Sequence, residues 1–97
     1  MNTITVKLKQ GLLLGGKPQL EAVIRESTMG DLREAHENFS DDSSAGAEMV
    51  RLQIVSIGGI EGPITQAMFD KITVTDFDRL QKAADELEAR GREDAEG

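Results

Sequence analysis

The sequence predicts an α+β fold in which an N-terminal β-hairpin packs on a small bundle of three to four helices. Two observations predict it. Over roughly the first 25 residues, apolar side chains recur at every second position, which is the period of a strand with one buried face. Beyond residue 28 they recur at every third or fourth position, which is the period of a helix. Because an isolated hairpin is only marginally stable in water, its apolar face needs the helices.

The hairpin is predicted from alternation on either side of a glycine-rich turn. The first strand is expected over about residues 2–9 and the second over about residues 18–25. Gly11 interrupts the first strand, and the three leucines at 12–14 could extend it past a bulge. Residues 15–18, Gly-Gly-Lys-Pro, form the turn, where proline is tolerated because its missing N–H can face the open side of the strand.

The first helix is predicted to begin after Ser27 or Thr28, either of which can cap it with a side-chain oxygen. Asp31 lies three residues after Thr28, and its charge suits the positive end of the helix. The apolar face of this helix holds Leu32, Ala35 and Phe39. The polar residues 40–44 are expected to form a loop that ends in a serine cap for the next helix.

The second helix is predicted over about residues 45–57 and carries two apolar stripes. One stripe holds Ala47, Val50, Ile54 and Ile57. The other holds Met49, Leu52 and Val55. The residues left to face water are Glu48, Arg51, Gln53 and Ser56. A helix this apolar is either central to a small core or partly covered by another chain, and both alternatives stay open. The glycine pair at 58–59 is expected to end it.

The last third of the chain is predicted to hold a short helix and a long one. Residues 62–63, Gly-Pro, form a turn, and the short helix follows over about residues 65–72. Thr75 opens the long helix with Asp76 in its first turn, and Gly91 ends it. Its apolar stripe holds Phe77, Leu80, Ala84 and Leu87.

Composition bounds the class of protein. A chain of 97 residues is one domain, expected over residues 1–90 and followed by a disordered acidic tail at 91–97. The formal net charge of −7 repels both a phosphate backbone and an anionic membrane, so neither is expected as a partner. The sequence has no cysteine, no apolar N-terminal signal and no apolar run near the roughly 20 residues of a membrane span. These features predict a soluble cytoplasmic protein.

No residue pattern predicts catalysis, a cofactor or a metal. His36, the one histidine, lies beside two glutamates, but consecutive helix positions do not converge on one ion, so it is expected to be a surface residue. Asp76 and Asp78 would point about 200° apart on a helix, which favours helix-start electrostatics over acid–base work. The glycine pairs lack the spacing of a phosphate-binding loop. The chain is therefore not expected to be an enzyme.

Two segments carry a family resemblance. Residues 24–32 read Ile-Arg-Glu-Ser-Thr-Met-Gly-Asp-Leu, and residues 69–76 read Phe-Asp-Lys-Ile-Thr-Val-Thr-Asp. With the hairpin before them, an apolar helix between them and an amphipathic helix after them, the chain resembles the tail assembly chaperone family of Mu-like tailed bacteriophages and related prophages. The similarity covers roughly residues 3–88. The loop at 40–47 carries no matching motif, and the leucines at 12–14 lie outside the pattern.

The resemblance implies a protein without catalysis that binds the long, apolar, helical tape measure protein in the cytoplasm of the bacterial host. It would keep that protein soluble and present it to tail tube subunits, and it would be absent from the mature virion. Many such proteins are made in two forms by a ribosomal frameshift. This chain would then be the shorter form, an extension would begin after Gly91, and the extended form would be a further partner.

The candidate partner-binding residues come from two apolar stripes. They are Met49, Leu52, Val55, Phe77, Leu80 and Leu87. The stripe on the long helix could equally belong to the core or form a seam between two copies in a homo-oligomer. Two other classes remain as alternatives. One is a structural connector or baseplate-associated protein that stays in the phage tail. The other is an acidic mimic of nucleic acid, which is disfavoured because basic residues interrupt the acidic ones along the chain.

Overall fold

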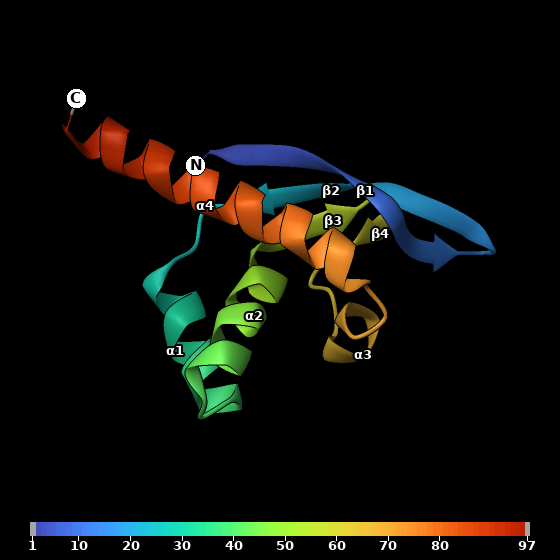
Figure 1. Cartoon of the computed structure of the whole chain (residues 1–97), viewed down its shortest axis with the longest axis horizontal. Coiled ribbons are helices and arrows are strands. Elements are labelled where there is room, and N and C mark those ends of the chain that lie inside the picture. Colours follow the sequence, from blue (N-terminus) through green and yellow to red (C-terminus); the bar gives the residue numbers. More distant parts are fainter. Residues whose placement is uncertain (1, 97) are drawn as a thin grey trace.

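The structure is a computed structural model that describes the backbone of residues 2–96 and the side chains of residues 2–92. Its strands are β1 (Thr3–Leu14), β2 (Lys17–Arg25), β3 (Ile54–Ile57) and β4 (Ile60–Glu61). Its helices are α1 (Met29–Asn38), α2 (Asp42–Gln53), α3 (Gln66–Phe69) and α4 (Val74–Glu96). The strands form one antiparallel sheet in the order β1-β2-β3-β4, and α4 runs along it (Figure 1). This architecture confirms the predicted α+β class.

The β1–β2 hairpin carries the predicted bulge. Pairing runs from Thr3 opposite Arg25 to Lys7 opposite Glu21, and it resumes with Leu12 opposite Gln19. The strand therefore extends past the bulge through the leucines to Leu14, as predicted for a bulge at Gly11. Gly11 has φ +62°, and a Cβ at this position would overlap the carbonyl oxygen of Gln19. Only glycine fits here, because the backbone conformation and the space both exclude a side chain.

The prediction of a helix over residues 45–57 is wrong for its last four residues. Helix α2 begins earlier, with Asp41 rather than Ser44 as its N-cap, and ends at Gln53. Residues 54–57 form β3, in which Ile57 pairs with Ala22 and Ile54 pairs with Ile24. These residues are mostly β-branched and pack well on a pleated surface, and the second edge of β2 offers them backbone partners. The glycines at 58–59 form the turn into β4 instead of ending a helix.

The polar face of α2 is buried, contrary to the prediction that it faces water. Glu48, Arg51 and Gln53 are 3%, 9% and 4% exposed. Each has partners that a single helix cannot supply. Glu48 and Arg51 meet α1 and the segment that leads into α3, while Gln53 donates through Nε2 to the carbonyl oxygen of Arg25 at 3.0 Å. Hydrogen bonding across elements makes burial of these groups tolerable.

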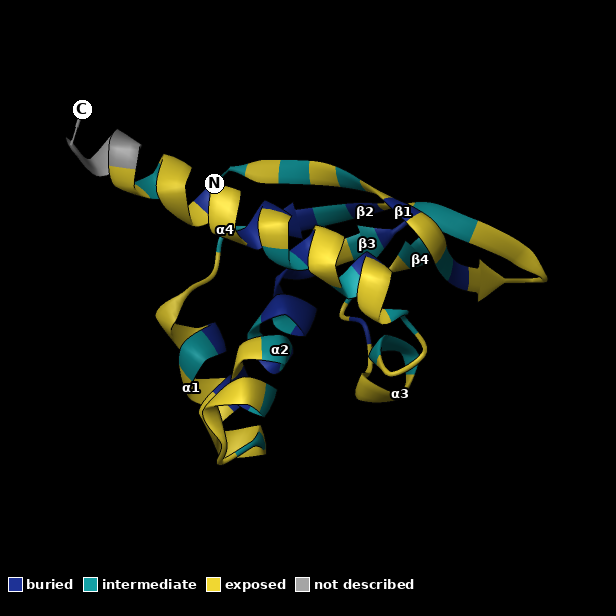
Figure 2. Ribbon diagram, in the orientation of Figure 1, coloured by how far each residue is buried: buried dark blue, intermediate teal, exposed yellow. Residues whose placement is uncertain are grey.

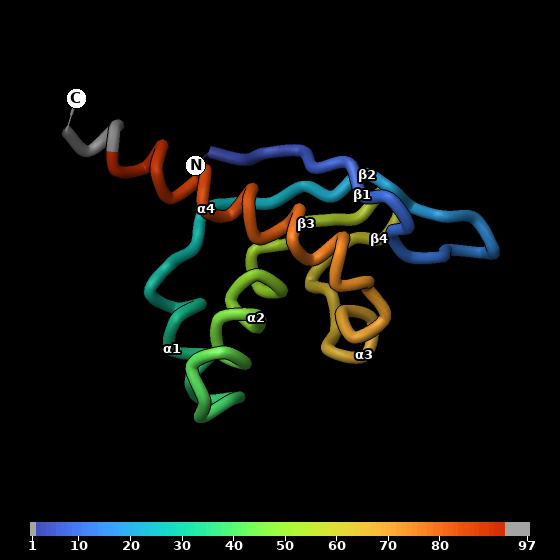
Figure 3. Tube along the Cα trace, viewed as in Figure 1, coloured from blue at the N-terminus to red at the C-terminus, as the bar shows by residue number. Residues whose placement is uncertain are grey.

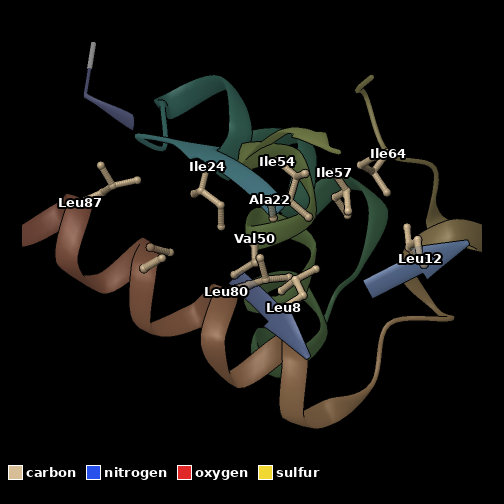
Figure 4. Packing of buried hydrophobic residues seen from close by; sticks show 12 residues of the cluster. Leu8, Leu12, Ala22, Ile24, Val50, Ile54, Ile57, Ile64, Leu80 and Leu87 are labelled. Carbon is tan, nitrogen blue, oxygen red and sulfur yellow. The ribbon is translucent and has the colours of Figure 1, made fainter. Parts of the chain in front are cut away.

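One apolar core lies between the sheet and the helices (Figure 4). Its buried members are Leu8, Leu12, Ala22, Ile24, Val50, Ile54, Ile57, Ile64, Leu80, Ala83, Ala84 and Leu87. Leu80 and Leu87 project from α4 toward the sheet and are fully buried. Their burial favours the alternative that this part of the stripe belongs to the core over the prediction that it binds a partner. A stripe at helical spacing buries its full width when a sheet covers it.

The start of α4 is joined to the bulge of β1, and the sequence predicted only the helical part of this junction. Asp76 lies in its first turn as expected, and its amide donates to the hydroxyl of Thr73 at 3.2 Å. The carboxylate, however, is fully buried and accepts the amides of Lys9, Gln10 and Gly11 at 2.6, 3.0 and 2.9 Å. Three consecutive amides that converge on one carboxylate form an anion-binding nest. Asp76 thereby joins the start of α4 to the bulge of β1.

The end of α4 differs from the prediction. The helical backbone continues through Gly91 to Glu96 instead of stopping at Gly91. The predicted tail at 91–97 falls mostly outside the described residues, since Gly97 and the side chains of residues 93–96 are not described. The division into a domain of residues 1–90 and a disordered tail stays a prediction. None of the described helices is both long and apolar enough to cross a membrane.

Candidate functional site

The three aromatic residues of the chain gather at one surface groove. Phe39, Phe69 and Phe77 are all half-buried, and Phe69 and Phe77 pack against the edge of the core. They line two adjoining hollows of about 380 and 240 Å³ between α2, α3 and α4. We call this surface the aromatic groove and define it by its apolar lining: Phe39, Ala47, Phe69, Ile72, Val74 and Phe77. A soluble fold normally buries such side chains first, so their place at the surface favours a binding role.

The walls of the aromatic groove are set by the short helix α3. Thr65 caps it by accepting the amide of Met68 at 3.1 Å, so Phe69 lies at its last turn. The ring of Phe69 meets that of Phe77 edge to face, with centroids 6.0 Å apart. Val74, the first residue of α4, is 77% exposed. The groove thus combines a fixed aromatic pair with an unpartnered aliphatic side chain, which is the composition of an interface anchor site.

A buried ion pair holds the elements around the groove in place. The carboxylate of Glu48 accepts Nε and Nη2 of Arg51 at 2.6 and 2.8 Å, Nδ2 of Asn38 at 2.7 Å and Nε2 of Gln66 at 2.9 Å. Arg51 also donates through Nη1 to the carbonyl oxygen of Ile64 at 2.6 Å. The hydrogen bonds from Arg51, aided by those from Gln66 and Asn38, lower the pKa of Glu48 to about 2. Because α1, α2 and the start of α3 share this cluster, they are held together beside the aromatic groove.

The charge at the aromatic groove is acidic. Asp70 lines both of its hollows and is exposed. Glu48 lines one of them but is already paired with Arg51. Among the described residues, no lysine, arginine or histidine lines either hollow. An apolar partner with a basic residue beside its contact face would therefore find a complementary charge here.

The predicted site residues do not form one surface. Phe77 lies in the aromatic groove. Met49 is half-buried in a separate cleft of about 190 Å³ between α2 and α4, and Leu52 is half-buried at the end of α2. Val55 is 44% exposed on β3. Leu80 and Leu87 lie in the core.

The sequence reasoning missed Phe39, Phe69 and Val74. The available signal was composition, because the chain has only three aromatic residues and large aromatic side chains are common at interfaces.

A second exposed apolar surface lies at the far end of the hairpin. Leu13 and Leu14 are 71% and 47% exposed. With Ile60, Met68 and Lys71 they line a groove of about 400 Å³. We call residues 12–17 the hairpin end. Figure 2 shows that it extends past the helices and is largely exposed.

The described side chains offer little support for a metal site or a catalytic histidine. His36 is exposed, and its Nδ1 lies 3.0 Å from the carbonyl oxygen of Leu32. In the described part of the chain, no three histidine, aspartate or glutamate side chains are grouped so that they could hold a metal ion. The surfaces built by this fold are suited to binding apolar protein segments.

Comparison with known proteins places the chain among phage proteins. A sequence model of the family described as "Tail assembly protein gp41" matches residues 37–97. The "Probable tail assembly protein gp41" of Escherichia phage Mu is 35% identical over 82% of this chain and 67% of its own length. The "Probable tail assembly protein FS-gp41" of the same phage is 35% identical, and the chain spans 52% of that protein.

A prophage relative extends the comparison beyond phage Mu. The "Mu-like prophage FluMu protein gp41" of Haemophilus influenzae is 34% identical over 84% of this chain and 76% of its own length. No solved structure matches the chain. The resemblance carried by residues 24–32 and 69–76 is therefore confirmed at the level of a tail assembly family. The chain belongs to the gp41 tail assembly protein family of Mu-like phages and prophages.

Proposed function

We propose that the protein is a tail assembly chaperone that binds an apolar helical segment of the tape measure protein in the aromatic groove and performs no catalysis. It would keep this client soluble in the host cytoplasm until the tail tube forms, and it would be absent from the mature virion. Tail tube subunits and an extended form of the chain are further proposed partners. The membership of a tail assembly family supports the setting in which this role is proposed.

One observation carries the proposal: Phe39, Phe69 and Phe77 are only partly buried and line a surface groove, where Phe69 and Phe77 also pack against the edge of the core. An amphipathic helix that lays its apolar face into such a groove is a recurrent mode of peptide recognition. Aromatic side chains supply large apolar contact area with few rotatable bonds, so they lose little entropy on binding. The formal net charge of −7 would keep a complex with an apolar client in solution.

The test is co-expression with the tape measure protein of the same phage or prophage, followed by affinity purification. The groove variant is Val74→Asp, because Val74 is exposed and an acidic residue in the first turn of a helix is stabilising. The matched control is Met29→Asp, since Met29 is the first residue of α1 and is 63% exposed. We expect Val74→Asp to reduce client retention at least about tenfold, the loss of one anchor contact. Met29→Asp should retain the client.

Equal retention by both variants would exclude the aromatic groove. The cleft beside α2 is then the next place to look, and the double variant Met49→Asp, Leu52→Asp tests it. Loss of client with unchanged helix content would place binding on that stripe. Loss of folding would show that these half-buried residues belong to the packing of α2.

A structural connector or baseplate-associated protein of the phage tail is the second candidate. Two results would favour it: this chain would be found in purified virions in stoichiometric amounts, and the client would aggregate in the co-expression test. A chaperone should instead be absent from the particles and present in the soluble complex.

A further inference from the structure

The charge of this chain is strongly polarised along its length. The first 20 residues contain Lys7, Lys9 and Lys17 and no acidic residue, which is a net charge of +3. The other 77 residues carry a net charge of −10. Because residues 3–14 and 17–25 pair in β1 and β2, these lysines lie on one hairpin, and Lys17 is the one at its end. The hairpin end and the C-terminal helix lie toward opposite ends of the molecule (Figure 3).

The hairpin end combines one of these lysines, Lys17, with exposed apolar side chains. Leu13 is 71% exposed and pairs with Pro18 across the hairpin, while Leu14 pairs with Lys17. Gly15 and Gly16 form the turn with positive φ angles of 58° and 81°, so the tip is narrow. The leucines at 12–14 lie outside the family pattern that the sequence suggested, and the core uses only Leu12. Neither Leu13 nor Leu14 belongs to the buried core.

Helix α3 and the residues after it separate the hairpin end from the aromatic groove. Met68 and Lys71 line the groove beside the hairpin. Phe69 and Asp70 line the aromatic groove. Two neighbouring residues of this segment therefore carry opposite charges, with Lys71 at the groove beside the hairpin and Asp70 at the aromatic groove. Since strand pairing holds the hairpin end on its own side of this segment, the chain's own tip cannot enter its own aromatic groove.

We propose that the hairpin end of one copy docks in the aromatic groove of a second copy, with Leu13 as the apolar anchor and Lys17 facing Asp70. The surfaces match in kind, since a narrow apolar tip with a basic residue meets an apolar groove with an acidic one. Symmetric alternatives are disfavoured. Contact of tip with tip would bring lysines together, and contact of groove with groove would bring Asp70 against Asp70.

The proposed contact is head-to-tail and weak. A tip of six residues buries less than the roughly 1,200 Å² of a stable interface, so association should need high protein concentration. Its charge component should weaken as salt rises. A head-to-tail contact does not close on itself unless its rotation allows it, so masses beyond a dimer are expected. Resting on the proposed function, the second copy would cover the aromatic groove until the client displaces it.

The experiment measures mass by light scattering and sedimentation over a range of concentrations up to the millimolar level. The tip variant is Leu13→Asp and the groove variant is Val74→Asp, with Met29→Asp as the matched control. Wild type and control should associate with rising concentration, and each variant alone should stay monomeric. An equal mixture of the two variants should form a dimer and nothing larger, because it contains one intact tip and one intact groove for each pair.

Charge reversal gives a second readout that does not depend on apolar packing. Lys17→Glu should weaken association several-fold at low salt, and the double variant Lys17→Glu, Asp70→Lys should restore it. A wild type that remains monomeric at every concentration would overturn the proposal. So would unchanged association of Leu13→Asp, or a mixture of variants that stays monomeric although circular dichroism shows both to be folded.

The outcomes are separable from those of the client test. Client retention by a strictly monomeric wild type would overturn self-docking and leave the proposed function standing. Self-association in which only the mixture of the two variants forms a dimer, without client retention, would support self-docking and overturn the proposed function. If both hold, Leu13→Asp should capture more client than wild type when the protein is concentrated, since no tip competes for the aromatic groove.

Discussion

Arg25 and Asp31 form a two-pronged ion pair across the corner between β2 and α1. Nη1 of Arg25 donates to Oδ2 at 2.7 Å, and Nη2 donates to Oδ1 at 2.9 Å. Nη2 also donates to the carbonyl oxygen of Leu52 at 2.8 Å, near the end of α2. Asp31 closes a capping box by accepting the amide of Thr28 at 2.9 Å, while its own amide donates to the Thr28 hydroxyl at 3.2 Å. Residues 24–32, which carry the family resemblance, are therefore a structural joint.

Replacing Asp31 should be more costly than removing a simple helix cap. Asp31→Ala removes the capping box and leaves Arg25 without its main partner, so we expect a loss of about 2–4 kcal/mol in the free energy of unfolding. Asp41 caps α2 at an exposed position, so Asp41→Ala should lose clearly less. Urea unfolding of both variants measures the difference. Equal losses would mean that the pair with Arg25 adds nothing to the cap.

Two glycines with the same backbone conformation should respond differently to alanine. Gly11 and Gly15 have φ angles of 62° and 58°. Gly15→Ala should cost about 1–2 kcal/mol, the strain of the left-handed conformation, because no atom lies near the added Cβ. Gly11→Ala meets the backbone of Gln19 as well, so it should cost clearly more and disturb the bulge. Thermal unfolding of the two variants measures these losses. Equal losses of stability would contradict the steric explanation.

Asp76 should matter more for stability than its neighbour in the same helical turn. Burial by itself raises the pKa of Asp76, but the amides of Lys9, Gly11 and Gln10 outweigh this effect, and the pKa is lowered overall. Asp76→Asn keeps one acceptor oxygen but turns an amide donor toward the N–H groups of the bulge, so we expect a loss of about 2–4 kcal/mol. Asp78→Asn, at an exposed position, should change stability by less than about 0.5 kcal/mol. Chemical denaturation of both variants tests this.

Stability should fall in acid in a way that Glu48 partly controls. Its folded pKa of about 2 lies below the ordinary value of 4.5, so its stabilising contribution is complete above about pH 5 and is lost as the pH falls through 2. At about 1.4 kcal/mol for each pKa unit, the contribution is about 3 kcal/mol. The lowered pKa values of Asp31 and Asp76 act in the same direction.

The check is urea unfolding of wild type and Glu48→Gln at pH 7 and pH 3. The variant should be less stable at pH 7, because Arg51 loses its buried partner. It should also lose less stability than wild type between the two pH values, since the group that titrates is absent. The same loss in both proteins would show that Glu48 does not carry the acid sensitivity.

Local patterns in the sequence determined much of this fold. Alternation determined the hairpin, the position of Gly11 determined its bulge, and Thr28 with Asp31 determined the start of α1. The spacing of Leu80, Ala84 and Leu87 determined the face that α4 buries. The order of motifs was enough to recognise the tail assembly family. Each of these features depends on residues close together in the chain, where sequence spacing and spatial neighbourhood coincide.

The tertiary structure alone decided the features that depend on distant segments. Residues 54–57 continue an apolar helical pattern, yet they form β3 because β2 offers a free edge. Glu48 and Arg51 look like a solvated helix face, yet Asn38, Ile64 and Gln66 bury them. The three phenylalanines meet at the aromatic groove only after all four helices are assembled, because Phe39 caps the end of α1. Burial is a property of the assembled elements, so a one-dimensional pattern does not distinguish a core face from a binding face.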